Sequence, residues 1–75
     1  MARTLWLFSR NDCPLCEEAE ALATALGISY EYRDISTDVD LLEKYRNRIP
    51  VFFDPESGNE HGAPIDPKVL TDLAR

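Results

Sequence analysis

Positive charge, histidine and long apolar runs are all scarce in this chain of 75 residues. Eight lysines and arginines stand against fourteen aspartates and glutamates, which gives a formal net charge of -6. This balance argues against binding to nucleic acid or to an anionic membrane, because both partners require a basic surface. No apolar stretch approaches the roughly 20 residues that span a bilayer. A single histidine also excludes a metal site built from several imidazoles.

The chain is also short, and its first residues lack the apolar segment and small-residue cleavage site of a secretory signal peptide. At this length we expect one domain, residues 1–75, with a small hydrophobic core. We expect a monomeric, cytoplasmic protein. In that reducing compartment, paired cysteines are more often catalytic or metal-binding than structural.

Only two cysteines occur, and they lie three residues apart in the motif C-P-L-C at residues 13–16. The motif follows an apolar run at residues 5–8 and precedes a helical pattern. A C-x-x-C motif at the start of a helix brings two sulfurs within bonding distance and places the first beside unpaired backbone amides. The sequence therefore predicts a dithiol that is oxidised and reduced in turn.

Strand-like segments alternate with helical ones along the chain. Residues 3–8 and 49–53 are apolar on both faces, as in central strands, and Pro50 must lie at the beginning of the second. Residues 28–34 alternate in polarity and indicate an edge strand with one solvated face. A short strand over 60–63 would complete a hairpin with the strand before it.

Three helices are predicted between and after these strands. The first covers residues 13–26, the second starts at an N-cap, Thr37, and runs to about residue 46, and the third follows the N-cap Asp66. Apolar residues at helical spacing predict the buried faces. These are Leu15, Ala19, Leu22 and Leu26 in the first helix, Val39, Leu42 and Tyr45 in the second, and Val69, Leu70 and Leu73 in the third.

The resulting order is β-α-β-α-β-β-α, an α/β fold. The first two strands should run parallel through a right-handed crossover, and the last two antiparallel. Because the first and third strands are apolar on both faces, we place them at the centre of a four-stranded mixed sheet. The predicted strand order is 2-1-3-4, with three helices flanking the sheet.

The chain resembles the glutaredoxins, in particular the small glutaredoxin-like proteins of bacteria with the thioredoxin-like fold. Three segments carry the resemblance over essentially the whole chain: residues 10–16 (RNDCPLC), 48–51 (RIPV) and 62–66 (GAPID). The family usually has tyrosine where this chain has Leu15. Of the paired glycine and acidic residues that hold glutathione in the family, only Gly62 and Asp66 are similar here.

The resemblance implies that Cys13 is the nucleophile, that Cys16 resolves, and that the Ile49–Pro50 bond is cis and faces the disulfide. Such a bond would let the N–H and C=O of Ile49 pair with an extended substrate backbone. Arg10 and Arg48 have two interpretations. They either contact a carboxylate of glutathione or of another substrate, or they are ordinary surface charges. The candidate substrate-binding residues are Arg10, Pro14, Leu15, Arg48, Ile49, Pro50 and Gly62.

The chemistry of Cys13 follows from its position, because a thiolate attacks disulfides and a helix N-terminus favours the anion. Arg10 would add positive charge and Asp12 would oppose it, so we expect a moderately lowered pKa for Cys13. Cys16, one turn deeper, would stay protonated until it displaces the reduced product. An external reductant, glutathione or a thioredoxin-reductase-type dithiol, would restore the pair, so we expect no tightly bound cofactor and no metal.

The sequence thus predicts a thiol–disulfide oxidoreductase that reduces protein disulfides or glutathione mixed disulfides. One alternative is a non-catalytic thioredoxin-fold module that senses redox state or binds a partner. A second is a zinc site completed by His61 and carboxylates, although a lone histidine in a polar segment is most simply solvated. An iron–sulfur cluster shared between two copies, as in some relatives, is also left open.

Overall fold

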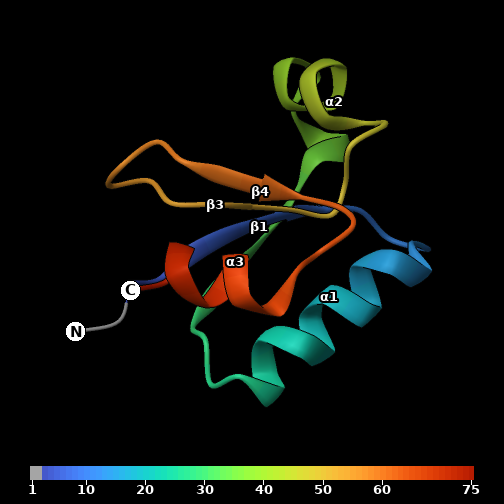
Figure 1. Ribbon diagram of the computed structural model, residues 1–75. Helices are drawn as coiled ribbons and strands as arrows, with labels where there is room; N and C mark the ends of the chain where they lie inside the picture. Colours follow the sequence, from blue (N-terminus) through green and yellow to red (C-terminus); the bar gives the residue numbers. More distant parts are fainter. Residues whose placement is uncertain (1–2) are drawn as a thin grey trace.

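The computed structural model describes residues 3–75. The elements are β1 (Leu5–Ser9), α1 (Pro14–Ala25), β2 (Tyr30–Asp34), a 3-10 turn (Ile35–Thr37), α2 (Val39–Tyr45), β3 (Val51–Phe53), β4 (Glu60–Gly62) and α3 (Pro67–Leu73). One mixed sheet holds the strands in the order β2-β1-β3-β4 (Figure 1). The predicted α/β fold and strand order are confirmed. Within the described residues, no helix is long and apolar enough to cross a membrane.

The sheet combines one parallel pair of strands with two antiparallel pairs. β1 and β2 run parallel, with Leu7 opposite Tyr32. β1 and β3 run antiparallel, with Leu7 opposite Phe52, and β4 extends the sheet antiparallel to β3. Because parallel neighbours need a crossover, α1 connects β1 to β2. The C-x-x-C motif therefore follows directly from the end of a central strand.

Helices cover both faces of the sheet. α1 and α3 lie on one side of the sheet in Figure 1, and α2 lies on the other. The buried side chains agree with this arrangement, since Leu7 packs with residues of α1 and α3. Its neighbour Phe8 packs instead with Ile35 and with Tyr45 of α2. Thus β1 is buried on both faces, as its apolar sequence predicts.

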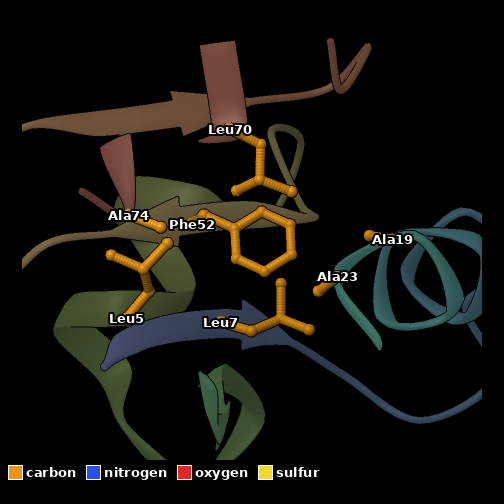
Figure 2. Packing of buried hydrophobic residues seen from close by; sticks show 7 residues of the cluster. All are labelled: Leu5, Leu7, Ala19, Ala23, Phe52, Leu70 and Ala74. Carbon is orange, nitrogen blue, oxygen red and sulfur yellow. The ribbon is translucent and has the colours of Figure 1, made fainter. Parts of the chain in front are cut away.

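The larger core cluster is arranged around the ring of Phe52. Figure 2 shows this ring between Leu7 and Leu70, with Ala23 of α1 facing it. Small side chains on α1 let the helix lie close to the sheet, so few large residues fit between the two. The buried members of the cluster are Leu5, Leu7, Ala19, Ala23, Phe52, Leu70 and Ala74.

The buried face of α1 differs from the predicted one. The residues that face the sheet are Cys16, Ala19 and Ala23, whereas Leu15 is 56% exposed and Leu26 is 41% exposed. Ala19 was predicted correctly, and Leu22 packs at the edge of the core. The prediction for the exposed leucines is wrong because residue size, which favours alanine beneath a closely packed helix, outweighs hydrophobicity here.

The faces of α2 and α3 also show one misplaced residue each. Tyr45 and Leu70 are buried as predicted, but Val39 is 71% exposed and Val69 is 43% exposed. At 3.6 residues per turn, Val39 lies about 120° around the helix from Tyr45, which turns it away from the sheet. The third helix starts as predicted, because the Asp66 carboxylate accepts hydrogen bonds from its first turn.

The start of α2 is displaced by one residue from the prediction. Asp38, not Thr37, is the N-cap, and its carboxylate accepts hydrogen bonds from the N–H groups of Asp40 at 3.0 Å and Leu41 at 3.2 Å. The Thr37 hydroxyl instead donates to the Asp34 carbonyl at 3.2 Å. The prediction of Thr37 as the cap is wrong because the preceding 3-10 turn already uses its side chain.

β2 occupies the sheet edge as predicted, but its two faces do not alternate in exposure. Tyr32 falls on the apolar side of the alternation in residues 28–34, yet it is 40% exposed. Arg33 is half-buried, and its guanidinium carbon lies 4.3 Å from the centre of the Trp6 ring. The arginine covers the aromatic ring by a cation–π contact, which polarity alternation alone does not reveal.

Candidate active site

Cys13 is the N-cap residue of α1. Its backbone is extended, and its sulfur accepts a hydrogen bond from the N–H of Cys16 at 3.2 Å. Pro14 occupies the first helical position, where its missing N–H has no role to fill. The Cys13 sulfur therefore lies at the positive end of α1, where amide hydrogens and the helix dipole favour a negative charge.

The loop before the helix turns the chain from β1 toward this position. Asp12 has a φ of 60°, in the left-handed region that aspartate and asparagine adopt more readily than most residues. Asn11 and Asp12 form a turn between β1 and the N-cap. These two polar residues thus form the bend that presents Cys13 at the start of α1.

The two cysteines form a disulfide in the structure. Their Cα atoms are 5.2 Å apart, within the usual range for a disulfide. Cys13 is partly exposed, while Cys16, facing the sheet from α1, is 2% exposed. A large partner therefore reaches the first sulfur more readily than the second, which suits a pair that attacks with one thiol and resolves with the other.

Both cysteines line a small acidic hollow of about 170 Å³ at the end of β1. Its wall carries the carboxylates of Asp12, Glu17 and Glu20 and one cation, the exposed Arg10. Ser9 closes the hollow from β1; it is fully buried, and its hydroxyl has no hydrogen-bond partner within residues 3–75. The electrostatic surroundings of the motif on this side are therefore mostly negative.

An apolar groove of about 520 Å³ lies beside the motif. We use this name for the space between α1 and the segment that joins β4 to α3. Its residues are Leu15, Glu18, Ala19 and Leu22 of α1, Pro50, and residues 63–65. Glu18 is the only ionisable residue among them, so the groove offers almost entirely apolar contacts.

Two cis peptide bonds occur beside this groove. The Ile49–Pro50 bond is cis, as the resemblance implied, and so is the Ala63–Pro64 bond. The segments are joined by a hydrogen bond from the N–H of Ala63 to the carbonyl of Pro50 at 3.1 Å. The second cis bond was missed because only about one X-Pro bond in twenty is cis and the segment carries no further signal.

The backbone of Ile49 is arranged differently from the prediction. Its N–H donates to the carbonyl of Tyr45 at 3.1 Å, so this donor is already used within the chain. The prediction that the N–H pairs with a substrate backbone is therefore wrong for this structure. The side chain packs into the core on the α2 side of the sheet, away from the apolar groove.

Arg48 belongs to a polar cluster with Glu60 and Tyr45. Its guanidinium donates to the Glu60 carboxylate at 2.7 Å and lies 5.3 Å from the Tyr45 ring centre. The Tyr45 hydroxyl donates to the same carboxylate at 2.7 Å. Burial, strengthened by the Glu60 contact, raises the pKa of Tyr45. Burial alone would raise the pKa of Glu60, but hydrogen bonds from Tyr45 and Arg48 outweigh it and lower that pKa.

The structure thus divides the predicted site residues into two groups. Arg10, Pro14 and Leu15 lie beside the two cysteines, and Pro50 joins them across the apolar groove. Arg48 is engaged with Glu60. Gly62 lies in β4 opposite Val51, where an added Cβ would contact that valine at 3.5 Å.

The sequence did not identify Glu18, Leu22 and residues 63–65 as groove residues, because spacing alone does not show which helix face meets the β4–α3 segment.

A metal site finds no support in the described part of the chain. Within residues 3–75, no three His, Cys, Asp or Glu side chains gather where they could hold a metal ion. The Nε2 atom of His61 accepts a hydrogen bond from the N–H of Asp66 at 2.9 Å. His61 is half-buried, so its description as a simply solvated residue is wrong: it joins β4 to the start of α3.

Comparisons with known proteins find one matching family and several similar solved structures. The family described as glutaredoxin-like domain (DUF836) matches residues 4–72. The target protein XcR50 from X. campestris is 37% identical in its X-ray structure, with 95% of this chain and 99% of that chain covered and a TM-score of 0.77. Its solution structure gives 38% identity, coverage of 100% and 97%, and a TM-score of 0.75.

Another solved structure has a lower sequence identity to this chain than XcR50 but a higher TM-score. Protein Ne2328 from Nitrosomonas europaea is 26% identical, with 100% of this chain and 94% of that chain covered and a TM-score of 0.85. No curated protein matches the chain. The fold is therefore the small thioredoxin-like arrangement of these structures.

Proposed function

The chain belongs to the glutaredoxin-like domain family, and on that premise we propose that it is a thiol–disulfide oxidoreductase acting through Cys13 and Cys16. The observation that carries the proposal is the position of the Cys13 sulfur at the N-cap of α1. There it accepts the Cys16 N–H at 3.2 Å and lies within bonding distance of the second sulfur. These are the features required of a nucleophilic thiol with a resolving partner.

The proposed reaction starts from the reduced pair. The Cys13 thiolate attacks one sulfur of a substrate disulfide; a new S–S bond forms, the substrate S–S bond breaks, and the leaving sulfur takes the electron pair and a proton from solvent. The Cys16 thiol loses its proton and attacks Cys13. The mixed disulfide breaks, the substrate leaves as a thiol, and the chain holds the Cys13–Cys16 disulfide. Two electrons have passed from the chain to the substrate.

Each residue of the motif has a defined part in this cycle. The amide hydrogens at the start of α1 stabilise the Cys13 thiolate before attack and again when it becomes a leaving group. Burial keeps the Cys16 thiol from competing with Cys13 for the substrate. Arg10 adds positive charge to an otherwise acidic surrounding. Pro14 fixes the first turn of the helix that carries both sulfurs.

The oxidised pair must be reduced by an external donor. In the proposed cycle, two glutathione molecules or a thioredoxin-reductase-type dithiol supply the two electrons, and the chain itself holds no tightly bound cofactor. The substrates would be protein disulfides or glutathione mixed disulfides, met by a monomer in the reducing cytoplasm.

A coupled assay tests the proposal. A glutathione mixed disulfide is supplied together with glutathione and glutathione reductase, or with a thioredoxin-reductase system in a parallel reaction. We expect turnover with at least one donor and its complete loss in Cys13→Ser, with circular dichroism confirming that the variant is folded. An unchanged rate in Cys13→Ser would overturn the proposal, and reversible oxidation without turnover would identify a redox sensor instead.

A further inference from the structure

We propose that the apolar groove selects protein substrates in which a large apolar side chain lies close to the disulfide cysteine, and that glutathione is a poorer partner. The inference rests on the proposed function, because it specifies which disulfides Cys13 attacks best. The occupant is an extended segment of a substrate protein, with its apolar side chain in the groove and a basic residue near Glu18.

The position of the groove supports this assignment. It starts at Leu15, which lies between the two cysteines and is 56% exposed, and it continues along α1 to Leu22. Seven residues of helix span about 10 Å, which is about three residues of an extended peptide. A substrate chain whose sulfur reaches Cys13 therefore places side chains up to about three residues away over the groove.

The lining of the groove defines the chemistry of the occupant. Its volume of about 520 Å³ falls in the range of small-ligand sites. Leu22 and Ile65 present apolar surface from opposite walls, α1 and the segment before α3. An apolar surface of this kind beside a reactive motif is where burial of a substrate side chain would add to binding.

The charges around the groove argue against glutathione, which carries a carboxylate at each end. None of the residues that line the groove is basic, and its one charged side chain, Glu18, repels a carboxylate. Arg48, the expected carboxylate contact, is already paired with Glu60 at 2.7 Å. Arg10 lies on the other side of the motif, in the hollow that also holds three carboxylates. A neutral or basic peptide meets none of these obstacles.

Rates of single-turnover reduction test the inference without any external donor. Two peptides differ only in a leucine or a serine two residues from their single cysteine, and each is linked as a mixed disulfide to the same small thiol. The glutathione mixed disulfide is the third substrate. We expect the reduced protein to react at least about tenfold faster with the leucine peptide than with either of the others, a difference of about 1.4 kcal/mol.

Variants on α1 connect this preference to the groove. Leu22→Gln introduces a polar group into the groove wall, and we expect the leucine-to-serine ratio to fall to about twofold. The matched control is Leu26→Gln, the same change one turn further along the chain, at an exposed residue outside the groove; it should keep the full ratio. Leu22 also packs on the core, so a second variant is made at an exposed residue of the opposite wall. This variant, Ala63→Glu, should lower the leucine-to-serine ratio in the same way.

The outcomes separate this inference from the proposed function. If all three substrates react at similar rates, or glutathione reacts fastest, the groove proposal is overturned while the oxidoreductase remains. If no disulfide reacts, both peptides are made with serine in place of their cysteine and are added in turn to isotope-labelled protein. Amide shifts at Leu22 and Ala63 that occur with the leucine-containing peptide and not with its leucine-free counterpart would support the groove proposal. The absence of such shifts would overturn it.

Discussion

Cys13 and Cys16 are three residues apart and differ sharply in exposure. The first is partly exposed at the helix N-cap, and the second is 2% exposed against the sheet. The helix itself creates the difference. Cys13 stands at the exposed start of α1, whereas Cys16 lies nearly one turn further along the helix axis, where it faces the sheet. A single short motif therefore supplies both an accessible sulfur and a protected one.

This asymmetry predicts different outcomes for the two serine variants. Cys16→Ser keeps the attacking thiol but cannot resolve, so after reaction with a glutathione mixed disulfide we expect one glutathione adduct per chain by mass spectrometry. Wild-type protein should show none, since Cys16 displaces the adduct. The assignment of roles would be contradicted if Cys13→Ser, and not Cys16→Ser, accumulated the adduct.

At the residue scale, the sequence was informative where a motif carried the signal. The C-x-x-C motif at a helix start and the cis Ile49–Pro50 bond were both anticipated. The pairing of Arg48 with Glu60 was not, because it depends on β4 bringing a residue twelve positions away beside the arginine. The residues next to Arg48 in the sequence do not show that Glu60 lies beside it in the fold.

Among the elements, α2 illustrates how a helix start depends on the preceding turn. Asp38 caps the helix through two backbone N–H groups, whereas the Thr37 hydroxyl faces back into the 3-10 turn. We expect Asp38→Ala to lower the free energy of unfolding by about 1 kcal/mol, a typical value for a lost N-cap.

Thr37→Ala is the matched comparison in this experiment. It removes one exposed hydrogen bond to a carbonyl, so its loss should be less than half that of Asp38→Ala. Urea denaturation of both variants measures the difference. A larger loss for Thr37→Ala would show that the helix starts where the sequence alone suggested.

The β3–β4 hairpin depends on Asp54, a fully buried carboxylate. It accepts hydrogen bonds from the Ser57 hydroxyl at 2.8 Å and from the Glu56 N–H at 3.0 Å, and it forms an ion pair with Arg3. Burial alone would raise the pKa of Asp54, but the bonds from Ser57, Glu56 and Arg3 outweigh it and lower that pKa. The carboxylate is therefore held in its charged form.

This shift gives the hairpin a defined dependence on pH. Because the pKa of Asp54 is lower in the folded state than the ordinary value of about 3.9, its stabilisation is fully present above that value. It is lost as pH falls toward the folded pKa. We expect Asp54→Asn to be less stable than wild type at pH 7, with the difference shrinking below about pH 4.

Unfolding by urea at a series of pH values measures this dependence. Glu43→Gln, an exposed carboxylate on α2, is the control and should follow wild type throughout. A constant difference between Asp54→Asn and wild type over the whole pH range would contradict the assigned role of the Asp54 charge.

Element types and order were predictable, but the rotation of each helix was less so. Apolar spacing placed Tyr45 and Leu70 correctly and misplaced Leu15 and Val39. Helical spacing defines a stripe about 100° wide or more, and short helices contain too few residues to fix its centre. Packing against the sheet decides which side of the stripe is buried.

At the scale of the whole molecule, the larger of the two core clusters is arranged around one ring. Phe52 is fully buried between α1, α3 and β1 (Figure 2). We expect Phe52→Ala to lower the free energy of unfolding by about 3–5 kcal/mol, a large part of the roughly 5–15 kcal/mol typical of small proteins. Val39→Ala, at a residue 71% exposed, should change it by less than about 0.5 kcal/mol.

Thermal and urea unfolding of these two variants compares a core residue with an exposed one. Equal effects would show that the described packing does not exist in solution.

The sheet order itself followed from the sequence, because only β1 and β3 are apolar on both faces and must therefore be central. The apolar groove could not be predicted, since it is formed by segments that meet only after the sheet has assembled.

Titration of a single thiol is the most direct test of the proposed chemistry. In reduced Cys16→Ser, ultraviolet absorbance of the thiolate follows Cys13 alone, and Cys13→Ser and the chain unfolded in denaturant are the references. We expect a midpoint for Cys13 clearly below the value of about 8.5 found for an unperturbed cysteine, and below that of either reference. A midpoint at or above about 8.5 would mean that the start of α1 does not stabilise the anion, and the proposed chemistry would lack its nucleophile.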